Sequence, residues 1–480
     1  MTDPARRPNI MIPRLAVIAM LVAVLAACTT TPTQPPTLEL PAASAAPAPA
    51  MPRWWTVFND PQLTSLVDEA LAHNLDLRAA MARIDEARAQ ILLAQRDLFP
   101  SVDLEAGASR TRSTQVGTNP LPPGFSPLTN DHVVSLNASY EVDLWGKYRN
   151  ATLAAQNDLL ATEYARETVR TVVAAEVATT YFNLVAADAQ LALLRDTLNT
   201  RDQSVSLQRD RYQGGVVGEF DVVTAEAERA AVAADIAANE RAIAEYESAL
   251  TVLLGRSPKD VYTPSIARTA ALDPLIEVPT IPAGLPSDLL ARRPDVRQAE
   301  DALAAASLRV DVARADYFPA VSLTGALGTE SGAMHNLFSG PAAIWSIGAS
   351  LLQPLIGLQA IEANVQTARA RREEVTVDYV KTVQTAFREV HDALIANRTT
   401  RDAAAAETQR SAKLQRALDL ADLRYRSGYS PYLEVLDAQR QLLAAQTLQI
   451  GAARNARLAV VDLAKALGGG WDYQQPLAAR

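Results

Sequence analysis

Twice along the chain, a helical residue pattern stops at Phe-Pro and is replaced by a strand pattern. The Ala-, Arg- and Glu-rich run before Phe99-Pro100 has helical spacing, whereas the residues after it alternate between apolar and polar. The same switch occurs 219 residues later, at Phe318-Pro319. Proline cannot continue a helix, and alternation with a period of two is the pattern of a strand with two different faces. The sequence therefore predicts a mainly helical fold into which strands are inserted at two places.

Three further markers indicate that this switch belongs to a duplicated unit, and one of them is the helix end Leu254-Gly255, which recurs 213 residues later as Leu467-Gly468. The stretch "SLNASYEVDLWG" (135–146) is matched by "SIGASLLQPLIG" (346–357), and "RYQGG" (211–215) is matched by "RYRSG" (424–428). The markers keep their order, and a unit of this length that occurs only twice is not a short-period solenoid. We expect an internal two-fold repeat in which each unit contains a helix, two strands joined by a loop, a long helix, a tight turn and a returning helix.

The long helices should be unusually long. Residues 147–212 contain neither proline nor glycine over 66 positions, and at ~1.5 Å per residue such a helix would be on the order of 100 Å long. A second long helix is expected over about 358–425, and shorter helices over Pro61–Leu98 and Glu219–Leu254. Apolar residues seven apart in the first long helix predict a coiled-coil-like seam: Val177, Leu184, Leu191, Leu198, Val205 and Tyr212.

Four alternating runs of about ten residues have the length of tilted transmembrane β-strands. They are predicted at about 100–112, 132–145, 319–330 and 343–353. Periodicity alone leaves open a half-buried hairpin in a water-soluble domain, but little other sequence is available to cover such a sheet. Because open sheet edges are not tolerated in hydrocarbon, several chains would have to pool four strands each to close one barrel.

The N-terminal region has the features of an exported lipoprotein. Residues 1–27 carry arginines before an apolar run and form an expected signal peptide. The run ends in "LAAC", which resembles a lipobox, so that Cys28 would be lipidated; a plain secretory peptide is the alternative. The remaining expected segments are a Pro/Ala-rich tether (28–52), the first repeat (53–255), a linker (256–284), the second repeat (285–468) and a C-terminal tail (469–480).

The composition argues against several other classes of protein. A net charge of −9 without a basic block disfavours nucleic acid as a partner. A single cysteine excludes an internal disulfide framework. The four histidines are scattered, which gives no support to a metal site or a histidine-based catalytic site. We therefore expect no cofactor, no metal and no enzymatic activity.

Five motifs, in order, resemble the outer-membrane efflux lipoproteins, which are TolC-like exit ducts of the NodT type. They are "WWTVFNDPQLTSLVDEALAHNLDLRAA" (54–80), "YEVDLWGKYRN" (140–150), "LLARRPDVRQAEDALAAA" (289–306), "DYFPAVSLTGALG" (316–328) and "LRYRSGYSPYLEVLDAQRQLLAAQ" (423–446). The resemblance implies a homotrimer with a twelve-stranded β-barrel above a periplasmic α-helical coiled-coil tunnel. It also implies docking to a periplasmic adaptor and an inner-membrane resistance-nodulation-division (RND) pump. The sequence departs from the family at "QPLIGLQAIEANV" (353–365), which leaves the local strand-to-helix turn open.

The expected function is therefore a passive outer-membrane duct for drugs or other small toxic compounds, in a multidrug efflux system. The alternative is a type I secretion duct that exports a polypeptide, and the two would differ in their genomic neighbours. A structural coiled-coil lipoprotein or an enzyme would not explain four amphipathic strands.

The resemblance also assigns functional residues near the "RYRSG" turn. Leu433 and Asp437 lie four apart on a helix that begins at Pro431, so they share one face. They align with the family's hydrophobic and acidic closing rings, and the periplasmic gate would comprise Leu433, Asp437, Arg424 (a counter-charge) and Tyr425. Spacing alone allows an exposed aspartate on an ordinary helix. The tip turns at Gly214, Gly215 and Gly428 would dock the adaptor.

Overall fold

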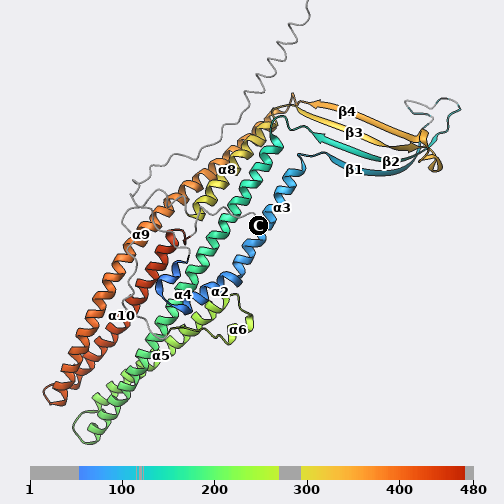
Figure 1. Cartoon of the computed structure of the whole chain (residues 1–480). Helices are drawn as coiled ribbons and strands as arrows, with labels where there is room; N and C mark the ends of the chain where they lie inside the picture. Colours follow the sequence, from blue (N-terminus) through green and yellow to red (C-terminus); the bar gives the residue numbers. More distant parts are fainter. Residues whose placement is uncertain (1–52, 115, 118–121, 123, 270–292, 471–480) are drawn as a thin grey trace, which may run out of the picture. The chain divides into compact units, whose positions relative to one another are not determined.

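The structure is a computed structural model, and it describes residues 53–114, 116–117, 122, 124–269 and 293–470 (Figure 1). The expected signal peptide, the lipidation site Cys28 and the tether lie outside these residues, as do parts of the expected linker and tail. The chain divides into two compact units. We call Glu86–Leu160 with Glu300–Asp378 the sheet unit, and the described residues of Leu38–Asp85, Ala161–Ala299 and Tyr379–Arg480 the helical unit.

The sheet unit contains one four-stranded antiparallel sheet in the order β1-β2-β3-β4 (Figure 1). The strands are β1 (Ser101–Arg112), β2 (Leu128–Glu141), β3 (Ala320–Ser331) and β4 (Ala343–Leu352). Each strand pairs with its neighbours in sequence, and β2 and β3 join the two halves of the chain. Within the described residues, β1 and β4 each pair with one strand only, so both are edge strands.

Strand β2 begins and ends earlier than the sequence predicts. Its first residues continue the ladder with the end of β1, where Leu128 faces Arg112. At its other end Val142 still donates to the Val321 carbonyl oxygen at 2.8 Å, but the Leu144 amide then turns back onto the Val142 carbonyl at 2.8 Å. Gly146, with φ +76°, completes the turn into the next helix. Alternation in sequence therefore outlasts the strand by a few residues.

The long helices are α4 (Lys147–Gln213, 67 residues) and α9 (Leu358–Arg426, 69 residues). Helix α5 (Glu219–Leu253) returns from the end of α4, and α10 (Tyr432–Ala466) returns from the end of α9. Past the ends of α5 and α10, Gly255 and Gly468 have φ values of +67° and +91°, the left-handed conformation that glycine adopts without steric cost. The shorter elements are η1 (Trp54–Phe58), α6 (Pro258–Tyr262), η2 (Met334–Asn336), η3 (Gly340–Ala342) and α8 (Pro294–Ala315).

The single helix predicted over Pro61–Leu98 is two helices, α2 (Pro61–His73) and α3 (Leu75–Arg96). Asn74 separates them with an extended ψ of 136°. Its side-chain oxygen accepts hydrogen bonds from the amides of Asp76 (2.9 Å) and Leu77 (3.2 Å), so Asn74 caps α3. Asparagine competes well with the helical backbone for such bonds, which explains the break. The expected cap at the start of α2 is present, since Asp60 accepts from the amides of Gln62 and Leu63.

The main core lies in the helical unit, where η1 and α2 pack against the middle of α4 and the ends of α5 and α10. Tyr181 is fully buried there, and its hydroxyl donates to the Asp60 carboxylate at 2.6 Å. Burial, followed by this hydrogen bond, raises the pKa of Tyr181 to about 12. The predicted seam is only partly buried, since Val177 and Leu184 are in the core but Tyr212 is exposed. An α-helix drifts by about 20° per heptad relative to a seven-residue repeat, so a straight stripe leaves the core.

Candidate functional site

The two helical hairpins, α4–α5 and α9–α10, end in turns of the same geometry (Figure 1). In the first, Gly215 has φ +71°, its amide donates to the Tyr212 carbonyl at 2.9 Å, and the Val216 amide donates to the Arg211 carbonyl at 2.8 Å. This pattern of bonds is a Schellman motif, which requires a left-handed residue at the helix end. Gly214, one position earlier, donates to Asp210 as part of the last helical turn.

The second turn repeats the first. Gly428 has φ +78°, its amide donates to the Tyr425 carbonyl at 3.0 Å, and the Tyr429 amide donates to the Arg424 carbonyl at 2.9 Å. Around both turns large apolar side chains are exposed; those more than 55% exposed are Val216, Phe220, Leu423, Tyr429 and Leu433. We call these five residues the tip patch. An exposed group of this kind is typical of an interaction surface.

The residues assigned to a gate lie on α10 and at the end of α9. Leu433 and Asp437 are both exposed, and Asp437 accepts a hydrogen bond from the Gln441 side chain at 2.6 Å. Arg424 was expected as a counter-charge for Asp437. Within one chain its guanidinium pairs instead with Glu434, in the first turn of α10, at 3.2 Å.

Tyr425 does not face open solvent but joins the two hairpins. Its hydroxyl accepts from the Gln208 side chain at 3.0 Å, and the Arg211 guanidinium lies 4.7 Å from the centre of its ring. Gln208 is fully buried. Tyr425 therefore ties the end of α9 to the end of α4 through a hydrogen bond and a cation–π contact. A small apolar cluster packs beside it: Val205, Ala225, Ala421, Tyr432, Val435 and Leu436.

A buried arginine holds the hairpins together farther from the tips. The Arg201 side chain on α4 is 2% exposed, lies 3.8 Å from the Glu228 carboxylate on α5 and donates to Gln439 on α10. Glu228 also accepts from Arg440 at 2.9 Å. This hydrogen bond, and the charges of Arg440 and Arg201, lower the pKa of Glu228, whereas burial lowers the pKa of Arg201. We call Arg201, Glu228, Gln439 and Arg440 the arginine network.

Sequence reasoning missed both the arginine network and the partner of Tyr425. The available signal was position, because Arg201 and Gln208 lie seven residues apart on the same face as Val205. Polar residues within an apolar helical stripe are buried with partners or mark a change of neighbour. The partners Tyr425 on α9 and Gln439 on α10 lie more than two hundred residues away, and their identity has no local signature.

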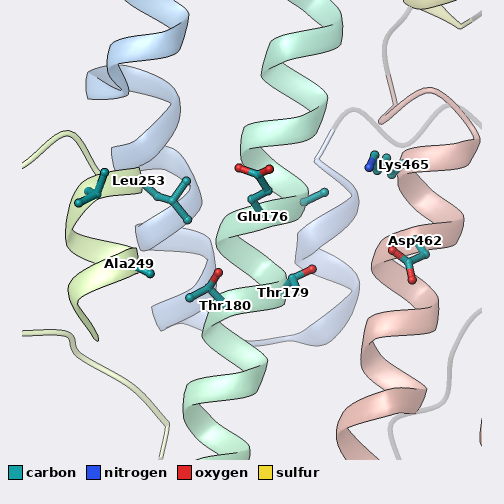
Figure 2. Close-up of a pocket in the computed structure, with 9 residues that line it drawn as sticks. Glu176, Thr179, Thr180, Ala249, Leu253, Asp462 and Lys465 are labelled. Atoms are coloured by element: carbon teal, nitrogen blue, oxygen red, sulfur yellow. The ribbon is translucent and has the colours of Figure 1, made fainter. Parts of the chain in front are cut away.

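A cleft of about 460 Å³ opens nearer the main core, between α4, α5 and α10 (Figure 2). Its polar lining includes Glu176 from α4 and both Asp462 and Lys465 from α10. Burial raises the pKa of Asp462, and the charge of Lys465 opposes this rise. Among the residues that the structure describes, no group of three or more His, Cys, Asp or Glu side chains could hold a metal ion.

One face of the sheet carries a row of exposed apolar side chains. Leu104 faces Leu136, Leu136 faces Leu327, and Leu327 faces Trp345, so the row crosses all four strands. Each of these side chains is at least 48% exposed, and Trp345 reaches 75%. The opposite face is polar, where Asn137 donates to Glu105 at 3.0 Å. Such a sheet suits contact with hydrocarbon on one side and water on the other.

Comparison with known proteins decides the family. The family model described as outer membrane efflux protein matches residues 66–256 and 285–469. The chain belongs to the outer membrane efflux protein family. The resemblance inferred from the five motifs is thereby confirmed, and the chain is an outer-membrane efflux channel. The two matched ranges lie close to the repeats expected from the sequence.

Individual relatives extend over most of the chain. A probable efflux pump outer membrane protein, TtgC of Pseudomonas putida, is 36% identical over 437 residues, which cover 91% of this chain and 88% of the relative. The cation efflux system protein CusC of Escherichia coli is 34% identical over 420 residues, covering 87% and 88%. Among solved structures, the CmeC outer membrane channel of Campylobacter jejuni has a TM-score of 0.86 at 28% identity and covers 92% of this chain and 96% of CmeC.

Proposed function

We propose that three copies of the chain form the exit duct of a tripartite efflux system, with a twelve-stranded barrel in the outer membrane and a helical tunnel in the periplasm. The observation that carries the proposal is the four-stranded sheet with an exposed apolar face, whose two edges are unpaired among the residues that the structure describes. Each unsatisfied backbone group at such an edge costs several kcal/mol in hydrocarbon. Closure with strands from other copies removes both edges, and helices of 67 and 69 residues supply walls for the tunnel.

The proposed partners are a periplasmic adaptor and an inner-membrane RND pump. The relatives are named as outer-membrane proteins of efflux pumps for antibiotics, toluene and solvents, or as part of a cation efflux system. The tip patch supports adaptor docking, because exposed apolar side chains surround both Schellman turns. The exported compounds are drugs or other small toxic molecules, and the energy for export comes from the pump.

The proposed gate is a ring of three Leu433 side chains beside a ring of three Asp437 carboxylates at the periplasmic end. Both side chains are exposed in one chain, which leaves them free to meet their copies around a three-fold axis. Like carboxylates that are brought close resist joint ionisation and attract cations. Tyr425 and Arg424 support the gate indirectly, since the first joins α9 to α4 and the second pairs with Glu434.

Lipidation of Cys28 is proposed as a second attachment to the outer membrane. Its support is the sequence "LAAC" at the end of an apolar run, with no other cysteine in the chain. The barrel would anchor the protein without the lipid, so trimer assembly does not depend on Cys28.

The proposed function is tested by the assembly that the chain forms. Native mass spectrometry of the detergent-solubilised protein should give a trimer, and a stable monomer with full β-structure would refute it. After mild crosslinking in its own host, the chain should co-purify with an adaptor and an RND pump. Recovery of an ABC transporter and an exported polypeptide instead would assign the chain to type I secretion.

The gate is tested by conductance in planar bilayers. Trimers with Leu433→Ala and Asp437→Ala should conduct substantially more than the wild type, because the apolar and acidic rings are both removed. The matched control changes the equivalent positions of the first hairpin, Phe220→Ala with Thr224→Ala, which removes no charge. Equal conductance of wild type and gate variant, with both trimers intact, would place the constriction elsewhere.

A further inference from the structure

The internal repeat contains a template for the contact between neighbouring copies. Strand β2 is the second strand of the first repeat, and it pairs with β3, the first strand of the second repeat. In a closed ring of repeats, β4 must join in the same way to β1 of the next copy. This step rests on the proposed trimeric barrel, but the register that follows from it is a separate statement.

The β2·β3 ladder fixes the register of the template. Its pairs run from His132 with Ser331 to Glu141 with Ser322. The repeat carries β2 onto β4, 211 residues later, since "SLNASYEVDLWG" (135–146) matches "SIGASLLQPLIG" (346–357). It carries β3 onto β1, 219 residues earlier, since Phe318-Pro319 matches Phe99-Pro100.

Applying both steps to the ladder gives the pairs between copies. The resulting partners, with the β4 residue first, are Ala343 with Arg112, Ser346 with Ser109, Leu351 with Leu104 and Leu352 with Asp103. All ten residues of β4 find a partner, and the first two residues of β1 stay beyond the ladder, as the first two of β3 do in the template. Faces also match, because Leu351 and Leu104 both lie on the exposed apolar face.

A side-chain contact beyond the end of the ladder forms the second part of the template. The Trp145 ring stacks on Phe318 with 4.7 Å between ring centroids and an interplanar angle of 20°. The Trp145 indole also donates to the Pro319 carbonyl at 2.8 Å. This contact closes the junction between the repeats where strands give way to helices.

The residues equivalent to this stacked pair have no such cover in a single chain. Ile356, which takes the place of Trp145, is 94% exposed, and Phe99, which takes the place of Phe318, is 69% exposed. Ile356 follows edge strand β4, and Phe99 precedes edge strand β1. Each edge of the sheet therefore carries one exposed apolar side chain. In a closed barrel, Ile356 of one copy would lie beside Phe99 of the next.

We infer that β4 pairs with β1 of the next copy in the register of the β2·β3 ladder, and that Ile356 packs on Phe99 of that copy. The ionic part of the template is not repeated, because the Lys147–Asp316 ion pair corresponds to Leu358 and Asp97. The contact between copies therefore lacks the ion pair that the contact within the chain has, because only the Asp97 carboxylate is kept at this position.

The two β-hairpins, β1–β2 and β3–β4, differ in register, and this difference shows which alternative register the test must resolve. Ser101 pairs with Ser139, but its equivalent Ala320 pairs with Leu352, two residues beyond Ser350, the equivalent of Ser139. A shift of two residues keeps every side chain on its face, so patterning alone does not distinguish the registers. Paired cysteines do, because a disulfide needs Cα atoms within about 7 Å.

The test is disulfide trapping in trimers formed by the full-length chain. Ser109→Cys with Ser346→Cys should give covalently linked trimers on non-reducing gels. The controls for a two-residue shift in either direction are Ser109→Cys with Ile344→Cys and Thr111→Cys with Ser346→Cys, and both should crosslink several-fold less. The two edge strands of one sheet are three strand spacings apart, about 14 Å, so none of these bonds forms within a chain. The parent chain, with Cys28 alone, is the blank.

Each outcome identifies what fails. Stronger crosslinking in a control variant overturns the register, while absence of crosslinking in a trimer confirmed by native mass spectrometry overturns the β4·β1 pairing itself. Absence of a trimer contradicts the proposed function instead. For the apolar contact, Phe99→Ala should lower the temperature at which the trimer dissociates, whereas Phe338→Ala, which removes another exposed phenylalanine, should not. Equal shifts for the two variants overturn the Ile356–Phe99 contact.

Discussion

Neutralising Glu228 should loosen the helical unit more than neutralising a similar glutamate two residues away. Glu228→Gln leaves the Arg201 guanidinium 2% exposed and without the carboxylate that now lies 3.8 Å from it. Removing one partner of a buried ion pair costs about 3–5 kcal/mol. Gln439 still accepts from Arg201, so we expect the lower limit, about 3 kcal/mol.

The matched control is Glu226→Gln on the same helix. Glu226 pairs with Arg209, but both side chains are exposed, at 42% and 58%. Exposed pairs of this kind contribute at most about 1 kcal/mol. The two substitutions change the same chemical group within one turn of α5, so the difference between them isolates burial.

Hydrogen exchange of the detergent-solubilised protein measures the effect locally. A loss of about 3 kcal/mol raises the opening constant roughly a hundredfold, in peptides that contain Arg201 or Gln439. Glu226→Gln should change exchange less than tenfold. Adding Arg201→Met to Glu228→Gln should restore much of the protection, because no uncompensated charge remains. Equal exchange in the two glutamine variants would refute a structural role for the buried pair.

The pKa of Glu228 predicts how the difference in stability between wild type and Glu228→Gln depends on pH. Hydrogen bonding from Arg440 lowers the pKa of Glu228 below its ordinary value of 4.5. Stabilisation by the carboxylate is therefore present above the unfolded-state pKa and is lost as the pH falls through the lower folded-state pKa. The difference in opening free energy between wild type and Glu228→Gln should be constant near neutral pH. It should disappear only below pH 4.5.

Three further changes have defined outcomes. Gly428→Ala places a side chain at φ +78° and should destabilise the tip by about 1–2 kcal/mol and weaken adaptor co-purification, whereas Gly451→Ala, inside α10 with open space around it, should be neutral or stabilising in thermal unfolding. Tyr181→Phe removes the donor to Asp60 and should increase exchange of α2 amides by the equivalent of about 1.5–3 kcal/mol; unchanged exchange would contradict this. Cys28→Ser should abolish labelling by a palmitate analogue, and persistent labelling would exclude lipidation there.

Much of the fold was predictable because it depends on local backbone chemistry. Phe-Pro stops a helix wherever it occurs, and the absence of proline and glycine over 147–212 left α4 no point at which to break. The break at Asn74 was missed because it depends on one side chain capping the following helix. The end of β2 was missed because the apolar–polar alternation continues past Glu141. There the chain already turns away from the sheet, at Val142 and Gly146.

The candidate site was less predictable, because its contacts join helices that are distant in sequence. Arg201 and Gln439 are 238 residues apart, and neither carries a local signal for the other. Leu433 and Asp437 could be placed on one helical face by spacing, but their assignment to a gate came from the family resemblance. The proposed closing rings need three copies, so one chain's periodicity contains no information about them.

The two repeats separate positions fixed by backbone geometry from positions fixed by a partner. Glycine is kept where φ is positive, as in Gly215 and Gly428, because the Schellman turn needs it in either hairpin. The buried polar residues of α4 are not kept: Gln208 corresponds to Ala421. Both side chains are buried, but only Gln208 has a tyrosine hydroxyl to donate to, and a buried amide without a partner would be costly in the second hairpin. Differences between the repeats at buried positions therefore point to tertiary contacts. The change from Thr224 to Asp437, at positions that are not buried, fits the proposed duct if the two hairpin tips face different surroundings there.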